Sequence, residues 1–195
     1  MRSLPVRMSL FASILAAVIC CAGPSLAKDA SRPHGPGVLT IMGDVGQTNR
    51  GPLDPFVDKL MEAQGARFER AMEFDHATLS ALGMHTIRVR YPTWPAAHEF
   101  EGPLLKDVLN AAGVTSGAVR PVALDGYATD IPYSDLEKWP VVLALKMDGR
   151  WLSIGGAGPT WVIYPRDSFP ELTQDDDAKW VWGVSHLRAV RGHGD

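Results

Sequence analysis

The clearest hydrophobic pattern in the chain lies between residues 87 and 91. Apolar side chains at positions 87, 89 and 91 alternate with two arginines, Arg88 and Arg90. An alternation with a period of two is typical of a half-buried β-strand, with successive side chains on opposite faces. The pattern therefore predicts a strand whose apolar side chains face a core and whose two arginines share the other face.

A proline-rich loop and a short helix are expected after this strand. Pro92 and Pro95 flank Trp94 and end the strand, because proline cannot donate to a sheet ladder. From 104 to 109 the apolar residues recur at helical spacing, and Gly113 fits a cap beyond the last turn. A loop with two arginines and a tryptophan, backed by an amphipathic helix, is a suitable place for a flat, anionic or polar ligand.

The rest of the pattern is rich in strands. Further strands are expected at 38–42, 119–124, 139–147, 161–164 and 180–184. Asp148-Gly149 gives a hairpin signal between the third of these strands and Trp151-Leu152. Short helices are expected within 58–72, with a break near Gly65, and over 74–82. The chain has no internal repeat, and the pattern predicts one α+β domain over residues 38–190.

The first 27 residues have the pattern of a cleaved signal peptide. Arg2 and Arg7 precede an apolar run over 10–22, and small residues at 25 and 27 favour cleavage before Lys28. Cys20 and Cys21 raise a lipoprotein alternative, to which the residues before them fit poorly. The expectation is an exported, periplasmic protein with a poorly ordered leader over 28–37.

Cysteine usage and charge then exclude several classes of function. Both cysteines lie in the expected signal peptide, so residues 28–195 hold neither a disulfide nor a thiolate for catalysis or soft-metal binding. Without residues 1–27 the chain has 17 basic against 22 acidic side chains. This acidic balance gives no indication of nucleic acid or an anionic membrane surface as a partner.

A series of short motifs carries a family resemblance. The motif residues are Trp94, Gly102, Asp125-Gly126-Tyr127, Thr129, Pro132, Leu143-Ala144, Asp148-Gly149 and Gly158-Pro159. In this order and spacing they resemble the sulfite oxidase-type molybdopterin-binding family, over most of residues 38–185. The resemblance implies that family's fold, an α+β domain with a mixed sheet and short helices.

Three positions depart from the family pattern. The family's molybdenum-binding cysteine falls on Arg90, and the arginine that grips the cofactor phosphate falls on Trp161. Gly156 stands in place of a polar residue. An arginine would repel a metal cation rather than bind it. The resemblance therefore implies an inactive relative that binds a pterin without molybdenum, and molybdopterin itself is not expected.

The chain is also similar to a cysteine-less, exported subgroup of this family, the pterin-binding regulators of the PruR type. That similarity implies a protein that senses a pterin or presents it to a signalling partner. The implied partner is the periplasmic domain of a membrane-bound cyclic-di-GMP enzyme. Direct binding to the membrane is not expected.

Six residues are candidates for the pterin site: Arg88, Arg90, Trp94, Asp125, Tyr127 and Trp161. A tryptophan face can stack on a heteroaromatic ring, and a carboxylate matches the adjacent N–H donors of a pterin. Each candidate also has a structural interpretation. The arginines fit a solvated sheet face, Asp125 fits an ordinary turn, and the aromatic side chains fit a core.

Two other functions stay open. One is a molybdopterin-dependent oxidoreductase with a non-cysteine metal ligand. The other is an interaction module without a small ligand, in which Trp94 would contact a partner. No catalytic or metal-binding residue is expected, because the histidines lack metal spacing and no Gly-x-Ser-x-Gly segment is present. The acidic run 175–177 is expected to be a solvated loop.

Overall fold

A five-stranded mixed sheet forms the larger part of the molecule. The computed structural model describes residues 28–29 and 31–191. The strand order is β4 (Met72–Phe74), β2 (Leu39–Gly43), β13 (Val184–Val190), β7 (Ala118–Ala123) and β8 (Ile131–Pro132). Strands β2 and β13 pair in parallel and the other neighbours are antiparallel. The predicted α+β domain with a mixed sheet is therefore confirmed.

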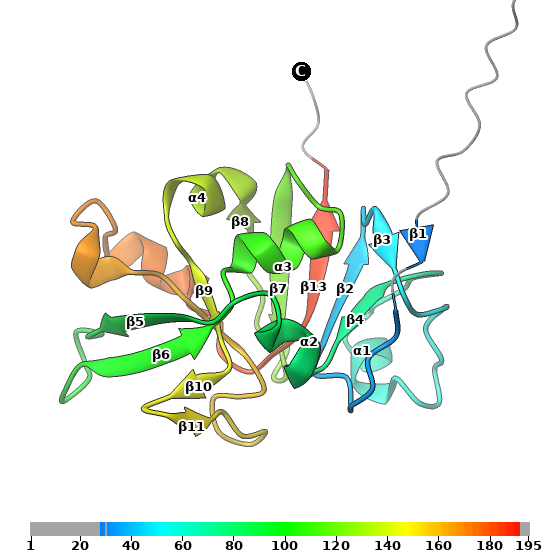
Figure 1. Ribbon diagram of the computed structural model, residues 1–195, viewed down its shortest axis with the longest axis horizontal. Helices are drawn as coiled ribbons and strands as arrows, with labels where there is room; N and C mark the ends of the chain where they lie inside the picture. The colour runs from blue at the N-terminus through cyan, green and yellow to red at the C-terminus, as the bar shows by residue number, and fades with distance from the viewer. Residues whose placement is uncertain (1–27, 30, 192–195) are drawn as a thin grey trace, which may run out of the picture.

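A second, antiparallel sheet lies beside the first, at the lower left of Figure 1. Its strands follow the order β11 (Arg150–Trp151), β10 (Lys146–Met147), β6 (His98–Gly102) and β5 (His85–Val89). Two short ladders complete the set. One pairs β9 (Val142–Ala144) with β12 (Trp161–Ile163), and the other pairs β1 (Lys28–Asp29) with β3 (Gln47–Thr48).

The helices are short. They are α1 (Lys59–Ala63), α2 (His76–Ser80), α3 (Leu105–Ala111) and α4 (Tyr133–Lys138), with 3₁₀ turns η1 (Arg166–Ser168) and η2 (Gln174–Lys179). In the part of the chain that the structure describes, no helix has the length and apolar character to span a membrane.

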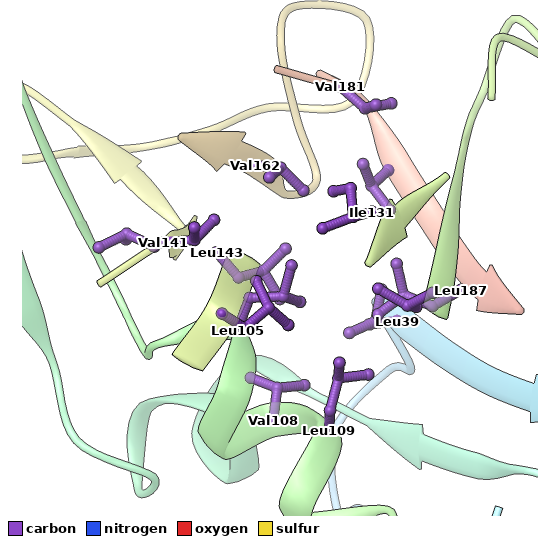
Figure 2. Packing of buried hydrophobic residues seen from close by; sticks show 14 of the residues in the cluster. Leu39, Leu105, Val108, Leu109, Ile131, Val141, Leu143, Val162, Val181 and Leu187 are labelled. Carbon is purple, nitrogen blue, oxygen red and sulfur yellow. The ribbon is translucent and has the colours of Figure 1, made fainter. Parts of the chain in front are cut away.

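The main core lies between α3 and the inner face of the five-stranded sheet. Helix α3 crosses in front of β7 and β13 in Figure 1, and its apolar face carries Leu105, Val108 and Leu109. Figure 2 shows these side chains directed toward Leu39 and Leu187, which come from β2 and β13. Complete burial of a leucine side chain contributes about 1.5–3 kcal/mol, so this stripe holds the helix on the sheet.

Most of the predicted strands are present, with shifted ends. The alternation at 87–91 belongs to β5, where Val89 is buried and Arg88 is exposed. The hairpin at Asp148-Gly149 is also confirmed, because both residues have the positive φ that a tight hairpin turn needs. The predicted strand over 139–147 instead splits into β9 and β10, which join different ladders.

Several elements differ from the sequence expectations. The predicted helix over 58–72 is limited to α1, because Gly65 takes a φ of +75° two residues after the helix ends. The last strand is not 180–184 but β13, since Gly183, at φ +63°, turns the chain immediately before it. Strand β6 and helix α4 were not predicted at all.

Part of the leader contacts the domain. The backbone N–H of Gly35 donates to Asp75 Oδ2 at 2.7 Å, and Arg32 Nε donates to the carbonyl of Asn49 at 3.2 Å. Residues 28 and 29 pair with β3. The expected signal peptide, with both cysteines, lies outside the described residues.

Candidate functional site

A cavity of about 750 Å³ opens where four loop segments meet beside the end of β7. The segments are the β5–β6 loop, the turn after β7, the loop before β12 and the stretch from η2 to β13. The lining residues are Tyr91, Trp94, Ala123, Asp125, Tyr127, Gly155, Gly156, Ala157, Trp161, Asp177, Ala178, Trp180 and Trp182. This volume falls in the range of small-molecule sites.

Aromatic rings build the inner wall of the cavity. The ring centroid of Trp94 lies 5.5 Å from Tyr91, 5.7 Å from Trp161 and 6.3 Å from Trp180. The Trp161 indole N–H donates to the carbonyl of Trp180 at 3.2 Å. These contacts fix the orientation of each ring, so a flat ligand would meet a surface that is already organised.

Two further aromatic residues stand at the mouth. Tyr127 and Trp182 are about half exposed. The hydroxyl of Tyr127 donates to the carbonyl of Ala178 at 2.9 Å, and this bond joins the turn after β7 to η2 across the opening. The rim is therefore aromatic and tied together at one point.

Asp125 stands exposed in the turn that carries Tyr127. Its Oδ1 accepts the backbone N–H of Tyr127 at 2.9 Å, as in an Asx-turn. Within the described part of the chain, Oδ2 has no hydrogen-bond partner. This oxygen is consequently available to a ligand with N–H donors.

Asp177 is the second carboxylate of the lining, and it is already neutralised. Its Oδ1 accepts from Arg166 Nη1 at 2.6 Å, and both side chains are largely buried. Burial, together with the Asp177 carboxylate, raises the pKa of Tyr91. The expectation that residues 175–177 form a solvated loop is therefore wrong for Asp177.

Its neighbour Asp176 is also ion-paired, and the pairing anchors η2. Lys179 Nζ lies 3.1 Å from Asp176 Oδ1 and 2.8 Å from Asp135 Oδ2. Tyr164, which is fully buried, donates its hydroxyl to the same Asp135 oxygen at 3.0 Å. Burial and the Asp135 carboxylate raise the pKa of Tyr164, which keeps the phenol protonated as a donor. A buried polar network thus fixes the far wall of the cavity.

Four of the six predicted site residues meet in this cavity: Trp94, Asp125, Tyr127 and Trp161. Arg88 and Arg90 are not brought there. Side chains alternate along β5 and its extension, so Tyr91 faces the cavity while both arginines are exposed on the opposite side. Arg90 instead uses its backbone N–H, which donates to Asp167 Oδ2 at 3.1 Å.

Sequence reasoning missed four lining residues with chemical character: Tyr91, Asp177, Trp180 and Trp182. The alternation that marks Tyr91 as an inward residue was visible, but it indicated core packing rather than a cavity. The two tryptophans fell in a predicted strand, 180–184, which hid their position at a loop. Their clustering with Trp94 depends on contacts across more than 80 positions, for which the sequence has no local signal.

The side chains that line the cavity are mainly aromatic and acidic. Among the described residues that line it, none is lysine, arginine, histidine or cysteine. No cluster of three or more metal-ligating side chains occurs within the described residues either. The cavity therefore suits a planar ligand with hydrogen-bond donors better than one with a negative charge.

Comparison with known proteins identifies the family. Among curated proteins, none shows significant similarity to this chain. The family model described as "Oxidoreductase molybdopterin binding domain" matches residues 60–189, which include all of the cavity lining. The chain belongs to the oxidoreductase molybdopterin-binding domain family.

Proposed function

We propose that this protein binds the ring of a phosphate-free pterin in the aromatic cavity and acts as a regulator, without molybdenum redox chemistry. The observation that carries the proposal is the composition of the lining. Six aromatic residues and two carboxylates surround the space, and none of the lining side chains carries a positive charge. The family supplies the pterin class of ligand.

The ring of a pterin matches this lining in shape and in hydrogen bonding. A bicyclic heteroaromatic ring can stack on an indole, which contributes on the order of 1 kcal/mol beyond its area burial. The pterin ring presents an amino group and a ring N–H side by side, and a carboxylate accepts from both. Asp125 Oδ2 is the acceptor without a partner in the described part of the chain, so we assign it this contact.

The complete molybdenum cofactor fits the same lining poorly. Its phosphate needs cationic partners, which the lining residues do not offer, and the exposed Asp125 carboxylate would repel it. Trp161 stands where the resemblance places the phosphate-binding arginine, and Arg90 stands where it places the metal-binding cysteine. Arg90 is also exposed and outside the cavity. These mismatches support binding without redox catalysis.

The location and the partner belong to the proposal as well. The signal-peptide pattern of residues 1–27 supports export to the periplasm. The similarity to pterin-binding regulators supports a membrane-bound cyclic-di-GMP enzyme as the partner, with the aromatic rim of Tyr127 and Trp182 as a suitable contact.

Family membership also favours a second candidate, a molybdopterin-dependent oxidoreductase with a non-cysteine ligand. One experiment separates the two functions. The chain is purified from the periplasm without heating, released small molecules are identified by mass spectrometry, and molybdenum is measured on the same sample. A pterin without phosphate and without molybdenum supports the proposal. Stoichiometric molybdenum would contradict the proposal and favour the oxidoreductase.

A titration tests the site itself. A pterin bound against Trp94, Trp161 and Trp180 should quench tryptophan fluorescence, so 6-hydroxymethylpterin is titrated and compared with its phosphate monoester. We expect the phosphate-free compound to bind at least tenfold more tightly. Equal or tighter binding of the phosphate ester would contradict the assignment of the acidic lining.

A further inference from the structure

A second cavity, of about 440 Å³, lies on the outer face of the five-stranded sheet. On β13, Leu187 and Ala189 face the main core, so His186 and Arg188 point to the other side. The end of α1 and the residues that follow it form another wall of this cavity. The lining residues are Met42, Ala63, Gln64, Gly65, Ala66, Arg120, Val122, Gly126, Ala128, His186 and Arg188.

Two arginines stand directly opposite each other on neighbouring strands of this face. Arg188 of β13 is the register partner of Arg120 of β7. Like charges in opposite positions of an antiparallel pair destabilise a sheet. Such a pair is unfavourable unless carboxylates or other anions neutralise the two guanidinium groups.

Only one of the two arginines is neutralised by the protein. Arg120 makes a two-pronged pair with Asp130, with Nε–Oδ1 at 2.8 Å and Nη2–Oδ2 at 2.6 Å. Within the described residues, Arg188 makes no hydrogen bond or ion pair with a carboxylate. No acidic side chain lines the cavity among those residues. The cavity thus holds an uncompensated positive charge.

The remaining polar groups of the lining are neutral. Burial and the nearby Arg188 lower the pKa of His186 to about 4, so its imidazole is uncharged at neutral pH. Its Nδ1 lies 3.2 Å from the hydroxyl of Ser185. Gln64 donates through Nε2 to the carbonyls of Ala123 and Leu124, at 2.8 and 3.2 Å. Both N–H groups of Gln64 are thereby used, so the free donors of the lining come from the Arg188 guanidinium.

We propose that this second cavity is a binding site for a small oxyanion of the phosphate class, with Arg188 as its principal ligand. A guanidinium offers two parallel N–H donors that match phosphate oxygens. Arg120 stays paired with Asp130 on the opposite strand, so the net positive charge of the cavity comes from Arg188. The volume leaves room for a small organic group on the phosphate, so free phosphate and a phosphate monoester share the same recognition chemistry.

The test measures phosphate binding to the chain without its signal peptide at pH 7.5 and constant ionic strength. Isothermal calorimetry and the melting temperature are recorded with inorganic phosphate, with glycerol 3-phosphate and with chloride. We expect a saturable effect of both phosphate compounds and none of chloride, because a ligand that binds only the folded state stabilises it. Tighter binding of glycerol 3-phosphate would identify a monoester as the preferred source, and tighter binding of inorganic phosphate would identify the free ion. The absence of saturable phosphate binding overturns the proposal.

Two matched variants locate the site. Arg188→Gln should weaken phosphate binding at least tenfold, whereas Arg150→Gln, which removes an exposed arginine from the other sheet, should leave it unchanged. An equal loss in both variants would show general charge attraction and overturn the proposal. If Arg188→Gln does not fold, Arg188→Lys retains the charge without the two-pronged geometry and should show an intermediate loss. Shifts of the His186 ring resonances on phosphate addition must accompany binding.

Discussion

Trp94 combines two roles within a single side chain. It lines the cavity, and it also packs against Tyr91, Phe100, Trp161 and Trp180 with ring centroids 5.5–6.3 Å apart. The sequence left stacking on a ligand and packing in a core as alternatives. In the structure the indole belongs to the aromatic cluster and the residue also borders the cavity.

Trp94→Ala should therefore change both affinity and stability. Loss of an aromatic anchor should weaken pterin binding by about 1–3 kcal/mol. The melting temperature should fall as well, because aromatic pair contacts are lost within the cluster. Fluorescence titration and thermal unfolding measure the two effects. Trp151→Ala is the matched control, since Trp151 is half exposed in the β10–β11 hairpin and should leave pterin affinity unchanged.

Asp125→Asn isolates the recognition of ligand donors. The asparagine Oδ1 can still accept the Tyr127 N–H, so the turn and the melting temperature should stay as they are. The new amide N–H groups would face the donors of the pterin, and unpaired groups of this kind cost about 1–3 kcal/mol. Pterin affinity should fall by a corresponding amount. Asp177→Asn offers a contrast, because it weakens the Arg166 ion pair and should lower stability. An unchanged dissociation constant in Asp125→Asn would move the recognition role to another acceptor.

At the scale of elements, one carboxylate holds a short helix and the leader together. Asp75 is the N-cap of α2 and accepts the Thr78 N–H at 2.7 Å, while its Oδ2 accepts the N–H of Gly35 at the same distance. These hydrogen bonds from Thr78 and Gly35 lower the pKa of Asp75 to about 2. Loss of an aspartate N-cap typically costs about 0.5–2 kcal/mol.

Asp75→Ala should thus destabilise the protein by about 1–2 kcal/mol, toward the upper end because the leader contact is lost too. Urea denaturation at neutral pH measures this change. Glu137→Ala, an exposed acidic residue of α4, is the control and should have little effect. A destabilisation by Asp75→Ala no larger than that of the control would show that neither contact contributes to the folded state.

The elements also show how far the sequence could be interpreted. Strong alternation located β5, and the Asp148-Gly149 turn located the β10–β11 hairpin, because local chemistry determines both. Strand β6 escaped notice because Phe100 is its only large apolar residue, and its pairing with β5 and β10 is what makes it a strand. Trp94, Asp125, Tyr127 and Trp161 could be predicted from motifs. Trp180 and Trp182 could not, because a turn at Gly183 decides where they point.

At the scale of the whole molecule, His186 links stability to pH. Its pKa is about 4 in the folded state, against about 6.5 in an unfolded chain. The unfolded chain therefore binds a proton first as the pH falls. The stability that the neutral His186 contributes is fully present above pH 6.5. It is lost progressively as the pH falls from 6.5 toward 4, by up to about 3 kcal/mol.

Unfolding free energies measured between pH 7.5 and 4 should show this decline. In His186→Gln the decline should be smaller, because the titrating group is gone, although the variant can start from a lower stability. His34→Gln, which changes an exposed histidine, should follow the unmodified protein. Parallel curves for His186→Gln and the unmodified protein would exclude His186 as the source. The Asp75 contribution changes in a different pH window: it is fully present above about pH 4 and is lost only as the pH falls from about 4 toward 2.

The turn after β7 serves as a common wall for the two cavities. Asp125 and Tyr127 point into the aromatic cavity, whereas Gly126 and Ala128 border the second cavity on the other side. Gln64 holds the start of this turn through the carbonyls of Ala123 and Leu124. By thermodynamic reciprocity, any factor by which an oxyanion changes pterin affinity must equal the factor by which the pterin changes oxyanion affinity. A positive coupling through this turn would make the occupancy of each cavity rise with the concentration of the other cavity's ligand.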